Sequence, residues 1–550
     1  MFCSRAVVDA QRTALLYPQG GRFHELTWGQ LHERAGQVAL RLTRLGVAPG
    51  DRVVQVSENS LEWLICDLGI MMSGGIHVPL HSTLAGPQIL QQIQDCGARI
   101  VLLQDDIKAR KLQKLAREIP ADVKLFTHKK CSWWLRRRLP LHEFFDPESD
   151  GSRADVMRLQ EEILSALKPN DLATILYTSG TTGEPKGVML SHGNLMFDTD
   201  GTLECFGTAE EELRLSFLPW SHIFARTCDI YTWIASGSKL AIAECREKIM
   251  DNIAELKPTL INSVPYFYER IYRGAADKGA LEKPHLARRL LGGRIRLYCS
   301  GGARLPIHVA EWLQRQEIPL LEGYGLTETS PVITMCTPEL YTIGSVGCPL
   351  PGVDVRIAED GEILTRGPHV MQGYYKKPEA TKAVIQDGWF YTGDLGRLDD
   401  DGALWITGRK KEIIVLATGK NIAPIAIESR LTTDPLIIQA LVVGDNRKYL
   451  TALIVPDPDA LKAEIRRRGI RVYSRKQALN HPQILDIYEG RIQQQLSTLS
   501  KTEQIQKFKL MNRGFTIESG EMTPTLKLKR NLIIQNCAAL IEGLYADDCP

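Results

Sequence analysis

The segment from Tyr177 to Gly187, YTSGTTGEPKG, contains the residue types that a polyphosphate site requires. Glycines let the backbone approach a ligand closely, while hydroxyl groups and a lysine ammonium supply donors for phosphate oxygens. The sequence therefore predicts a phosphate-binding loop, formed by Thr178, Ser179, Gly180, Thr181, Thr182, Gly183, Lys186 and Gly187.

This loop differs from a Walker A loop, in which GxxxxGK is followed by Ser or Thr. Here Lys186 is preceded by Pro185 and followed by Gly187. The runs DLATILY before the loop and GVML after it are typical of strands, whereas a Walker loop leads directly into a helix. A Walker-type kinase or ATPase is therefore disfavoured, and a solvated turn rich in Gly, Ser and Thr is the alternative.

The elements that must position this loop alternate between helix and strand. Residues 28–46 have helical spacing, whereas 51–58 and 74–80 are short runs rich in β-branched residues. The same alternation returns over residues 258–316. Alternation of this kind predicts parallel sheets covered by helices.

Beyond Gly344 the pattern changes to short strands between Gly-, Pro- and Asp-rich turns, which predicts a small antiparallel or barrel-like element. After Arg409 a strand-rich run over 436–457 precedes long helical stretches. We therefore predict an α/β protein. Its N-terminal body, residues 1–408, has two doubly wound sheets plus a small β-barrel, and residues 409–550 form a mobile C-terminal α+β lid.

Composition excludes several classes of protein. The 550 residues carry 67 basic and 65 acidic side chains, a net charge of +2, so no overall field favours nucleic acid. The N-terminus lacks the apolar core of a secretory signal, and no run reaches the ~18 apolar residues that span a bilayer. We expect a cytoplasmic protein that meets membrane, if at all, from its surface.

One basic and aromatic run, KKCSWWLRRRLP over residues 129–140, is of the composition found at lipid headgroups. It predicts peripheral membrane contact through Trp133, Trp134 and Arg136. The alternative is a surface loop whose tryptophans pack on the body of the protein.

The loop YTSGTTGEPKG resembles the phosphate loop of the adenylate-forming (AMP-binding) superfamily, which includes acyl-CoA synthetases, peptide-synthetase adenylation domains and firefly luciferase. Other segments resemble the family's motifs in the same order, over most of the chain. They are SFLPWSHIFART, YCSGGARLP, EGYGLTETSP, GWFYTGDLGRLDDDGALWITGRKKEII and TPTLKLKR.

The resemblance implies an ATP site. Tyr324 would face the purine, Glu328 would hold Mg²⁺ with Thr178, and Asp394 with Arg409 would grip the ribose hydroxyls. Taken alone, each of these residues would equally suit a turn. The implied adenine and metal side comprises Gly301, Gly302, Ala303, Glu322, Gly323, Tyr324, Gly325, Thr327 and Glu328.

The resemblance also implies catalytic roles. Lys186 would neutralise the β- and γ-phosphates, and Lys527, placed before Arg530, would bridge the carboxylate and the α-phosphate, with Lys529 as the alternative register. His222 would shape the entry of acid and thiol, although a histidine beside apolar residues is often only a loop or core residue. Lys411 occupies the family's hinge position. Some members carry a second lysine four residues later, where this chain has Val415.

Three segments, LPWSHIFART, VPYFYERIY and TPTLKLKR, resemble long-chain and bubblegum-type fatty acyl-CoA synthetases, with departures at Trp220 and Tyr266. The implied activity is an AMP-forming fatty acid:CoA ligase that uses a fatty acid, ATP, Mg²⁺ and coenzyme A. Two alternatives remain: an acyl-AMP ligase that passes the acyl group to a carrier protein, and a non-catalytic nucleotide or acyl binder.

Overall fold

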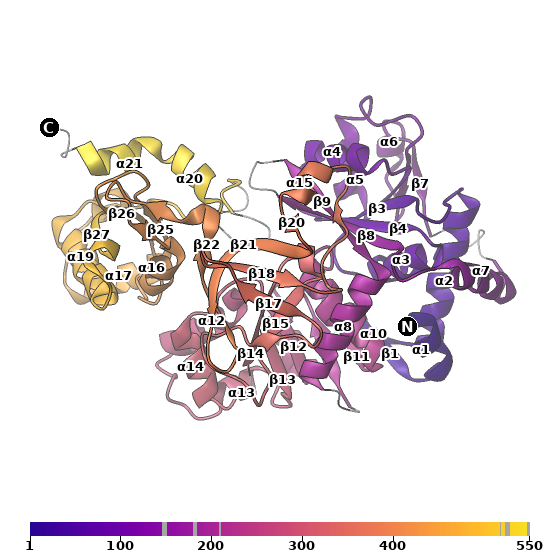
Figure 1. Cartoon of the computed structure of the whole chain (residues 1–550), viewed down its shortest axis with the longest axis horizontal. Helices are drawn as coiled ribbons and strands as arrows, with labels where there is room; N and C mark the ends of the chain where they lie inside the picture. Colours follow the sequence, from indigo (N-terminus) through magenta and orange to yellow (C-terminus); the bar gives the residue numbers. More distant parts are fainter. Residues whose placement is uncertain are drawn as a thin grey trace. The chain divides into compact units, whose positions relative to one another are not determined.

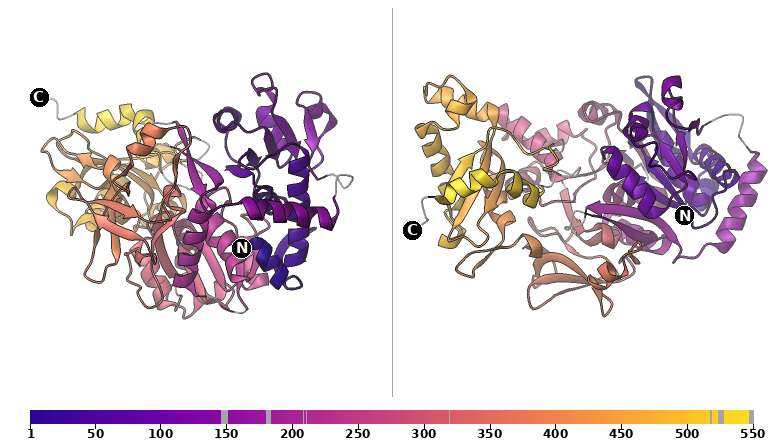
Figure 2. Two further views of the ribbon diagram at one scale, coloured as in Figure 1. Left: turned by 45° about the vertical axis from the view of Figure 1, so that its right-hand side comes forward. Right: turned by 90° about the horizontal axis from the view of Figure 1, so that it is seen from above.

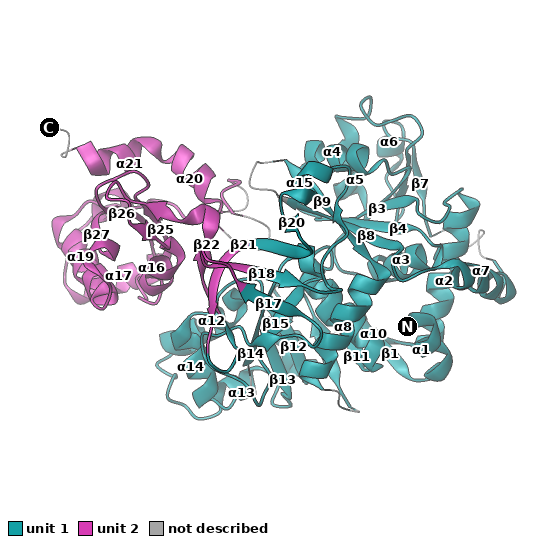
Figure 3. Ribbon diagram, viewed as in Figure 1, with its two compact units in different colours: residues 1–356, 364–392, 400–404 teal, residues 357–363, 393–399, 405–550 magenta. Residues whose placement is uncertain are grey.

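The computed structural model describes residues 1–145, 151–179, 184–207, 209, 211–318, 320–516, 519–522 and 528–546. The chain divides into two compact units (Figure 3). Unit 1 comprises residues 1–356, 364–392 and 400–404, and unit 2 comprises residues 357–363, 393–399 and 405–550.

An eight-stranded sheet in unit 1 carries the predicted phosphate loop. Its central strands are parallel, while the strand after the loop runs antiparallel to the strand before it. The order is β19 (Gly373–Tyr374), β9 (Pro185–Ser191), β8 (Leu172–Ser179), β4 (Ile76–Leu80), β3 (Arg52–Val56), β5 (Ile100–Leu103), β6 (Lys124–Thr127) and β7 (Leu141–Glu143).

A nine-stranded sheet forms the rest of the unit 1 framework. Strands from β14 to β1 in its order are parallel, and antiparallel strands extend both edges. The order is β16 (Cys348–Pro349), β15 (Val332–Met335), β14 (Leu320–Gly325), β13 (Leu297–Ser300), β12 (Leu260–Ser263), β10 (Leu213–Ser216), β11 (Lys239–Ile242), β1 (Thr13–Gln19) and β2 (Arg22–Thr27).

Helices cover both faces of the eight-stranded sheet (Figure 1). Because side chains alternate along a strand, Val53 of β3 belongs to the core that contains α2 and α3, whereas Val54 belongs to the core under α4 and α5. The core around Val53 also holds Leu15 and Leu240 of the nine-stranded sheet, so one core joins the two sheets. These helices are α2 (Trp28–Arg44), α3 (Leu61–Met72), α4 (Gly86–Cys96) and α5 (Asp106–Gln113).

A further core covers the nine-stranded sheet on the face that packs against α12 and α14. Figure 2 shows the ribbon of this part of the chain, in pink, from two further sides. The predicted doubly wound arrangement is confirmed. The other helices of unit 1 are α1 (Phe2–Val8), α6 (Trp133–Arg136), α7 (Arg153–Ala166), α8 (His192–Phe206), α9 (Ile223–Ala225), η2 (Arg226–Tyr231), α10 (Thr232–Ser236), α11 (Ile249–Leu256), α12 (Pro265–Asp277), α13 (Leu286–Leu290), α14 (Ile307–Arg315), η3 (Thr327–Thr329) and α15 (Pro378–Lys382).

The predicted small β-barrel corresponds to a five-stranded sheet. Its order is β17 (Asp354–Ile357), β18 (Glu362–Arg366), β21 (Trp389–Leu398) and β20 (Ile385–Gln386), with β22 (Leu404–Arg409) paired to β21. Among the described strands no pairing closes this order into a ring, so the element is an open sheet. A barrel needs a further pairing that joins the two ends of the strand order, and the pairings among the described strands do not include one.

The C-terminal part of unit 2 has its own α+β core, in which a three-stranded sheet packs against helices. None of the helices in the described part of the chain has the length and hydropathy that crossing a bilayer requires. The elements are η4 (Lys410–Glu412), β23 (Ile414–Val415), β24 (Asn421–Ile422), α16 (Pro424–Leu431), β25 (Ile437–Val443), β26 (Leu450–Pro456), α17 (Pro458–Arg467), α18 (Arg475–Ala478), α19 (Pro482–Leu496), η5 (Lys501–Glu503), β27 (Ile505–Leu510), α20 (Arg530–Asn536) and α21 (Ala538–Tyr545).

Candidate active site

The predicted phosphate loop is carried between two antiparallel strands. Thr178 of β8 is paired with Lys186 of β9, next to the pair of Ser179 and Pro185. The strand–loop–strand arrangement is therefore the one that the sequence predicts. Gly180, Thr181, Thr182 and Gly183, and the side chain of Ser179, lie outside the described residues.

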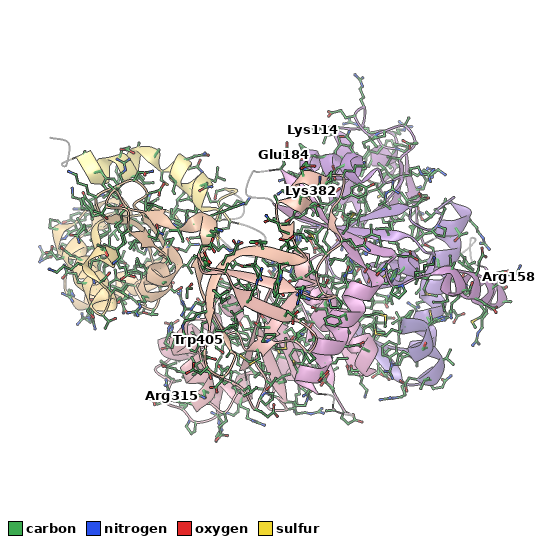
Figure 4. The ribbon with its side chains drawn as sticks, in the orientation of Figure 1. Lys114, Arg158, Glu184, Arg315, Lys382 and Trp405 are labelled. Atoms are coloured by element: carbon green, nitrogen blue, oxygen red, sulfur yellow. The ribbon has the colours of Figure 1, made fainter. Side chains whose placement is uncertain are left out.

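The residues that flank the loop are fixed by packing and charge. Glu184, the first described residue after the loop, is exposed (Figure 4) and forms an ion pair with Lys377 at 3.2 Å. A Cβ at Gly187 would lie 2.7 Å from Cγ2 of Ile175, so the close approach of the two strands requires glycine there. On the other side of β9, the Gly187 carbonyl accepts a hydrogen bond from the Tyr375 N–H at 2.7 Å.

Lys186 is connected to Glu328 through Tyr374. The Lys186 Nζ atom lies 4.9 Å from the centroid of the Tyr374 ring, a cation–π distance. The Tyr374 hydroxyl donates a hydrogen bond to Glu328 Oε1 at 2.8 Å. Burial, and next the Glu328 carboxylate, raise the pKa of Tyr374, so the phenol stays a donor at neutral pH. An ammonium, a phenol and a carboxylate thus form one connected series.

The sequence did not predict Tyr374. This residue reaches the site because β19 pairs antiparallel with β9, with Tyr374 opposite Val188. The only local signal is the pair of tyrosines in the run GYYKK, and nothing in their spacing relates them to Lys186.

Glu328 is presented by a tight turn after β14. The carbonyl of Glu328 accepts a hydrogen bond from the Met371 N–H at 2.8 Å, which ties η3 to the segment that leads into β19. A Cβ at Gly325 would lie only 1.7 Å from the Pro331 carbonyl oxygen. Only glycine therefore allows the chain to fold back on itself and place Thr327 and Glu328 in η3.

The predicted adenine-side residues lie at one edge of the nine-stranded sheet. Strands β12, β13 and β14 are parallel, with Ser300 next to both Ser263 and Glu322 in register. Gly301, Gly302 and Ala303 follow β13 directly, while Glu322, Gly323, Tyr324 and Gly325 belong to β14. In open α/β sheets the edge at the carboxyl ends of parallel strands is where ligands bind. Burial raises the pKa of Glu322 to about 7, so this carboxyl group is poised between its neutral and charged forms.

The oxygen donors fit a metal ion that arrives with a nucleotide. Within the described ranges no group of three or more His, Cys, Asp or Glu side chains could hold a metal ion. Mg²⁺, however, usually keeps several waters and takes one or two carboxylates together with substrate phosphates. Glu328 lies on η3, which packs against β9, and Thr178 lies opposite Lys186 of β9. One carboxylate beside a phosphate loop suits such an ion.

His222 lies in the loop between β10 of the nine-stranded sheet and α9. It caps α9, and its Nδ1 accepts a hydrogen bond from the Phe224 N–H at 3.3 Å. A Cβ at Gly301 would lie 3.0 Å from the Phe224 ring, so this loop lies against the segment after β13. The neighbouring Ser221 Oγ is 2.8 Å from Nδ1 of His81, which follows β4. The structure thus brings the His222 segment to the carboxyl ends of strands from both sheets.

Unit 2 contains the predicted ribose-binding pair. Arg409 Nε lies 3.0 Å from Asp394 Oδ1, and Asp394 is buried at 3% exposure. The neighbouring Gly393 N–H donates to Glu362 Oε1 at 2.8 Å, while Lys410 Nζ lies 2.7 Å from Glu362 Oε2. A Gly-Asp turn alone does not explain such a network. Lys411, the predicted hinge residue, belongs to η4 directly after Arg409.

The predicted catalytic lysine, Lys527, lies outside the described residues. Its sequence neighbours Lys529 and Arg530 are described. The Lys529 N–H donates to the Glu521 carbonyl at 2.8 Å. Arg530 forms a two-pronged ion pair with Glu428, with Nη2 at 2.6 and 2.8 Å from the two carboxylate oxygens. The arginine of the K-x-x-R pattern is thus anchored in unit 2.

Comparisons with known proteins agree with these motifs. A model described as "AMP-binding enzyme" matches residues 3–375, and one described as "AMP-binding enzyme C-terminal domain" matches residues 411–548. The long-chain-fatty-acid–CoA ligase FadD15 of Mycobacterium bovis is 34% identical, and the alignment covers 96% of this chain and 93% of the relative. The long-chain-fatty-acid–CoA ligase ACSBG2 of Gallus gallus is 28% identical, over 97% and 79% of the two chains.

Among solved structures, ATP-bound MatB from Rhodopseudomonas palustris matches with a TM-score of 0.73 and 25% identity, covering 98% of each chain. The resemblance to adenylate-forming enzymes, and to their long-chain and bubblegum-type members, is confirmed. With two family models that together match most of its length, the chain belongs to the AMP-binding enzyme family.

Proposed function

We propose that this protein is an ATP-dependent, AMP-forming long-chain fatty acid:CoA ligase. The observation that carries the proposal is the connected series Lys186, Tyr374 and Glu328 beside the phosphate loop. Relatives named long-chain-fatty-acid–CoA ligase, which align over nearly the whole chain, support the choice of acid and acceptor.

In the first half-reaction the fatty acid carboxylate attacks the α-phosphorus of ATP, pyrophosphate leaves, and an acyl-adenylate forms. Two anions must meet, so positioning and charge neutralisation account for most of the catalysis. Lys186 neutralises the β- and γ-phosphates, and Glu328 and Thr178 would hold Mg²⁺. When bound, Mg²⁺ supplies positive charge to the phosphate oxygens. The loop hydroxyls and glycines position the triphosphate.

Other residues orient the nucleotide and the acid. Tyr324 stacks on the adenine beside the small residues that follow β13, and Asp394 with Arg409 holds the ribose hydroxyls. Lys527 bridges the attacking carboxylate and the α-phosphate. His222 shapes the entry of the acid and of coenzyme A, whose thiol displaces AMP in the second half-reaction.

The proposal assigns different roles to two parts of the chain. Residues 1–408 hold most of the nucleotide and the acid, and residues 409–550, which supply Arg409 and Lys527, act as a lid that turns near Lys411 between the half-reactions. We also propose a cytoplasmic location, peripheral to a membrane that contains the acid.

The test is ATP–pyrophosphate exchange by the full chain with acids from acetate to palmitate, with and without coenzyme A. We expect exchange that needs both acid and Mg²⁺, is fastest with long-chain acids, and yields acyl-CoA when coenzyme A is present. Exchange without acyl-CoA would favour transfer to a carrier protein instead. No exchange with any acid would leave a nucleotide or acyl binder.

A further inference from the structure

Helices α5 and α6, together with the residues around them, form a surface at the far end of the eight-stranded sheet. The helices are joined at their amino ends: Asp106 Oδ2 accepts a hydrogen bond from Ser132 Oγ at 2.6 Å, and Asp106 Oδ1 accepts one from the Ser132 N–H at 3.2 Å. Ile107 follows Asp106, and Trp133 follows Ser132. The hydrogen bonds between Asp106 and Ser132 therefore hold in place the backbone that carries Ile107 at the start of α5 and Trp133 at the start of α6.

Both apolar side chains face solvent. Ile107 is 64% exposed and Trp133 is 67% exposed. Trp134 differs, because it is half-buried and packs against the core under α4 and α5. The alternative in which the tryptophans pack on the body therefore holds for Trp134 but not for Trp133.

Guanidinium groups cover both indole rings. Arg137 Cζ lies 4.8 Å from the centroid of Trp133, and Arg110 Cζ lies 4.8 Å from that of Trp134. An amphipathic ring next to cations is the pattern that sits well at the level of lipid headgroups.

Positive charge predominates on this surface, although Arg136 is ion-paired with Glu143 and Lys108 with Glu58. Residues 107–114 and 128–138 contain nine Lys and Arg but no Asp or Glu, although the whole chain has a net charge of only +2. Such a local excess attracts an anionic surface within a Debye length. The exposed cations are Arg110, Lys114, Lys129, Lys130, Arg136, Arg137 and Arg138, of which Lys114 is labelled in Figure 4.

The surface shares a sheet edge with the phosphate loop. Strands β3, β4, β5, β6 and β8 are parallel, so their carboxyl ends meet at one edge. The phosphate loop follows β8, and α5 and the run that contains α6 follow β5 and β6. Four strand spacings of ~4.8 Å separate β8 from β6, which places the two features roughly 20 Å apart along the edge.

We infer that the α5–α6 surface docks on an anionic lipid bilayer, with Trp133 and Ile107 at headgroup depth and the surrounding cations against lipid phosphates and carboxylates. The inference rests on the proposed function, because a long-chain acid is stored in bilayers. Docking by this edge brings the lipid reservoir to the edge of the sheet at which β8 ends. Docking itself requires neither ATP nor coenzyme A.

The test is co-flotation of the full chain with phosphatidylcholine vesicles, with and without phosphatidylserine, at low and high salt. We expect binding that depends on phosphatidylserine and weakens with salt. Because each cation near such a surface strengthens binding about fivefold, Lys129→Glu with Lys130→Glu should lower partitioning by at least about 25-fold. Trp133→Ala should lower it about tenfold through lost apolar burial.

Matched controls come from α7 of the same unit. Arg158→Glu reverses a cation that is 78% exposed (Figure 4), and Leu164→Ala shortens an apolar side chain that is 51% exposed. Both should bind vesicles like the unmodified chain, and thermal unfolding should show that all variants are folded. If folded variants of the α5–α6 surface bound vesicles as well as the controls, the inference would be wrong. Binding of the unmodified chain that does not depend on phosphatidylserine would also overturn it.

Vesicle binding and ligase activity, measured in separate assays, distinguish this inference from the proposed function. Ligase activity is measured without vesicles, on a water-soluble medium-chain acid. Vesicle binding without ligase activity would reject the proposed function and leave the docking surface standing. Ligase activity without vesicle binding would reject the docking surface and support the proposed function.

Discussion

Tyr374 and Glu328 are joined by a 2.8 Å hydrogen bond that crosses from the edge strand β19 to the turn after β14. The bond orients a carboxylate that the proposed mechanism assigns to Mg²⁺, and the same phenol ring lies under the Lys186 ammonium. We therefore predict that Tyr374 positions the two charged groups, Lys186 and Glu328, that the proposed mechanism places beside the triphosphate.

Replacing Tyr374 by Phe removes the donor but keeps the ring. A hydrogen bond to a charged group is worth about 1.5–3 kcal/mol, so kcat/KM for ATP–pyrophosphate exchange should fall at least tenfold. The control is Tyr375→Phe, since the Tyr375 hydroxyl makes only a 3.4 Å hydrogen bond to the Cys96 carbonyl. Equal losses in the two variants would show that Tyr374 has no special role.

Lys527→Ala should suppress acyl-adenylate formation far more than thioester formation from supplied acyl-adenylate. The physical reason is that an ammonium aimed at the α-phosphate stabilises charge that develops only in the first step. We expect a loss of at least about 100-fold in exchange, measured against Lys529→Ala as the neighbouring control. If Lys529→Ala gave the larger loss, the register of the K-x-x-R assignment would be wrong.

Gly325→Ala should destabilise unit 1 by at least about 3 kcal/mol, because a Cβ there would overlap the Pro331 carbonyl oxygen. Gly490→Ala is the matched control. It lies on α19, where a Cβ would meet no atom within 4 Å, so alanine should stabilise that helix by about 0.5–1 kcal/mol. Thermal and urea unfolding measure both. A Gly325→Ala protein as stable as the unmodified chain would contradict the packing argument.

Burial lowers the pKa of His128 to about 3, from an ordinary value of 6.5. The folded state therefore binds fewer protons than the unfolded state, and stability is lost as pH falls from about 6.5 toward 3. The contribution of this one group is at most about 5 kcal/mol. In His128→Gln the unfolding midpoint should fall less steeply with pH below 6.5 than in the unmodified chain. Parallel curves over that window would count against a buried neutral imidazole.

Local pattern was enough to predict the strands on each side of the phosphate loop, and the structure pairs Thr178 with Lys186 as strand–loop–strand requires. The resemblance to known motifs singled out Asp394 and Arg409, which form an ion pair. The first relationship joins residues that are close in sequence, and the second joins motifs that occur in a fixed order along the chain.

Tyr374 and the open five-stranded sheet could not be predicted in this way. The place of Tyr374 depends on the register of β19 against β9, which joins segments nearly two hundred residues apart. A short strand with turns gives the same sequence pattern in a sheet and in a barrel, because closure depends on tilt and stagger that one strand does not encode. The exposure of Trp133 likewise depends on the Ser132–Asp106 joint rather than on composition.

The division of the chain into units has a consequence for engineering. Unit 2 gathers residues 357–363 and 393–399 with everything from 405 onward, so Asp394 and Glu362 belong with Arg409 and Lys410. A chimera that exchanges only residues 409–550 with a homologue would combine carboxylates from one parent with cations from the other. Transplants should therefore carry residues 357–363 and 393–399 as well, so that the paired charges stay together.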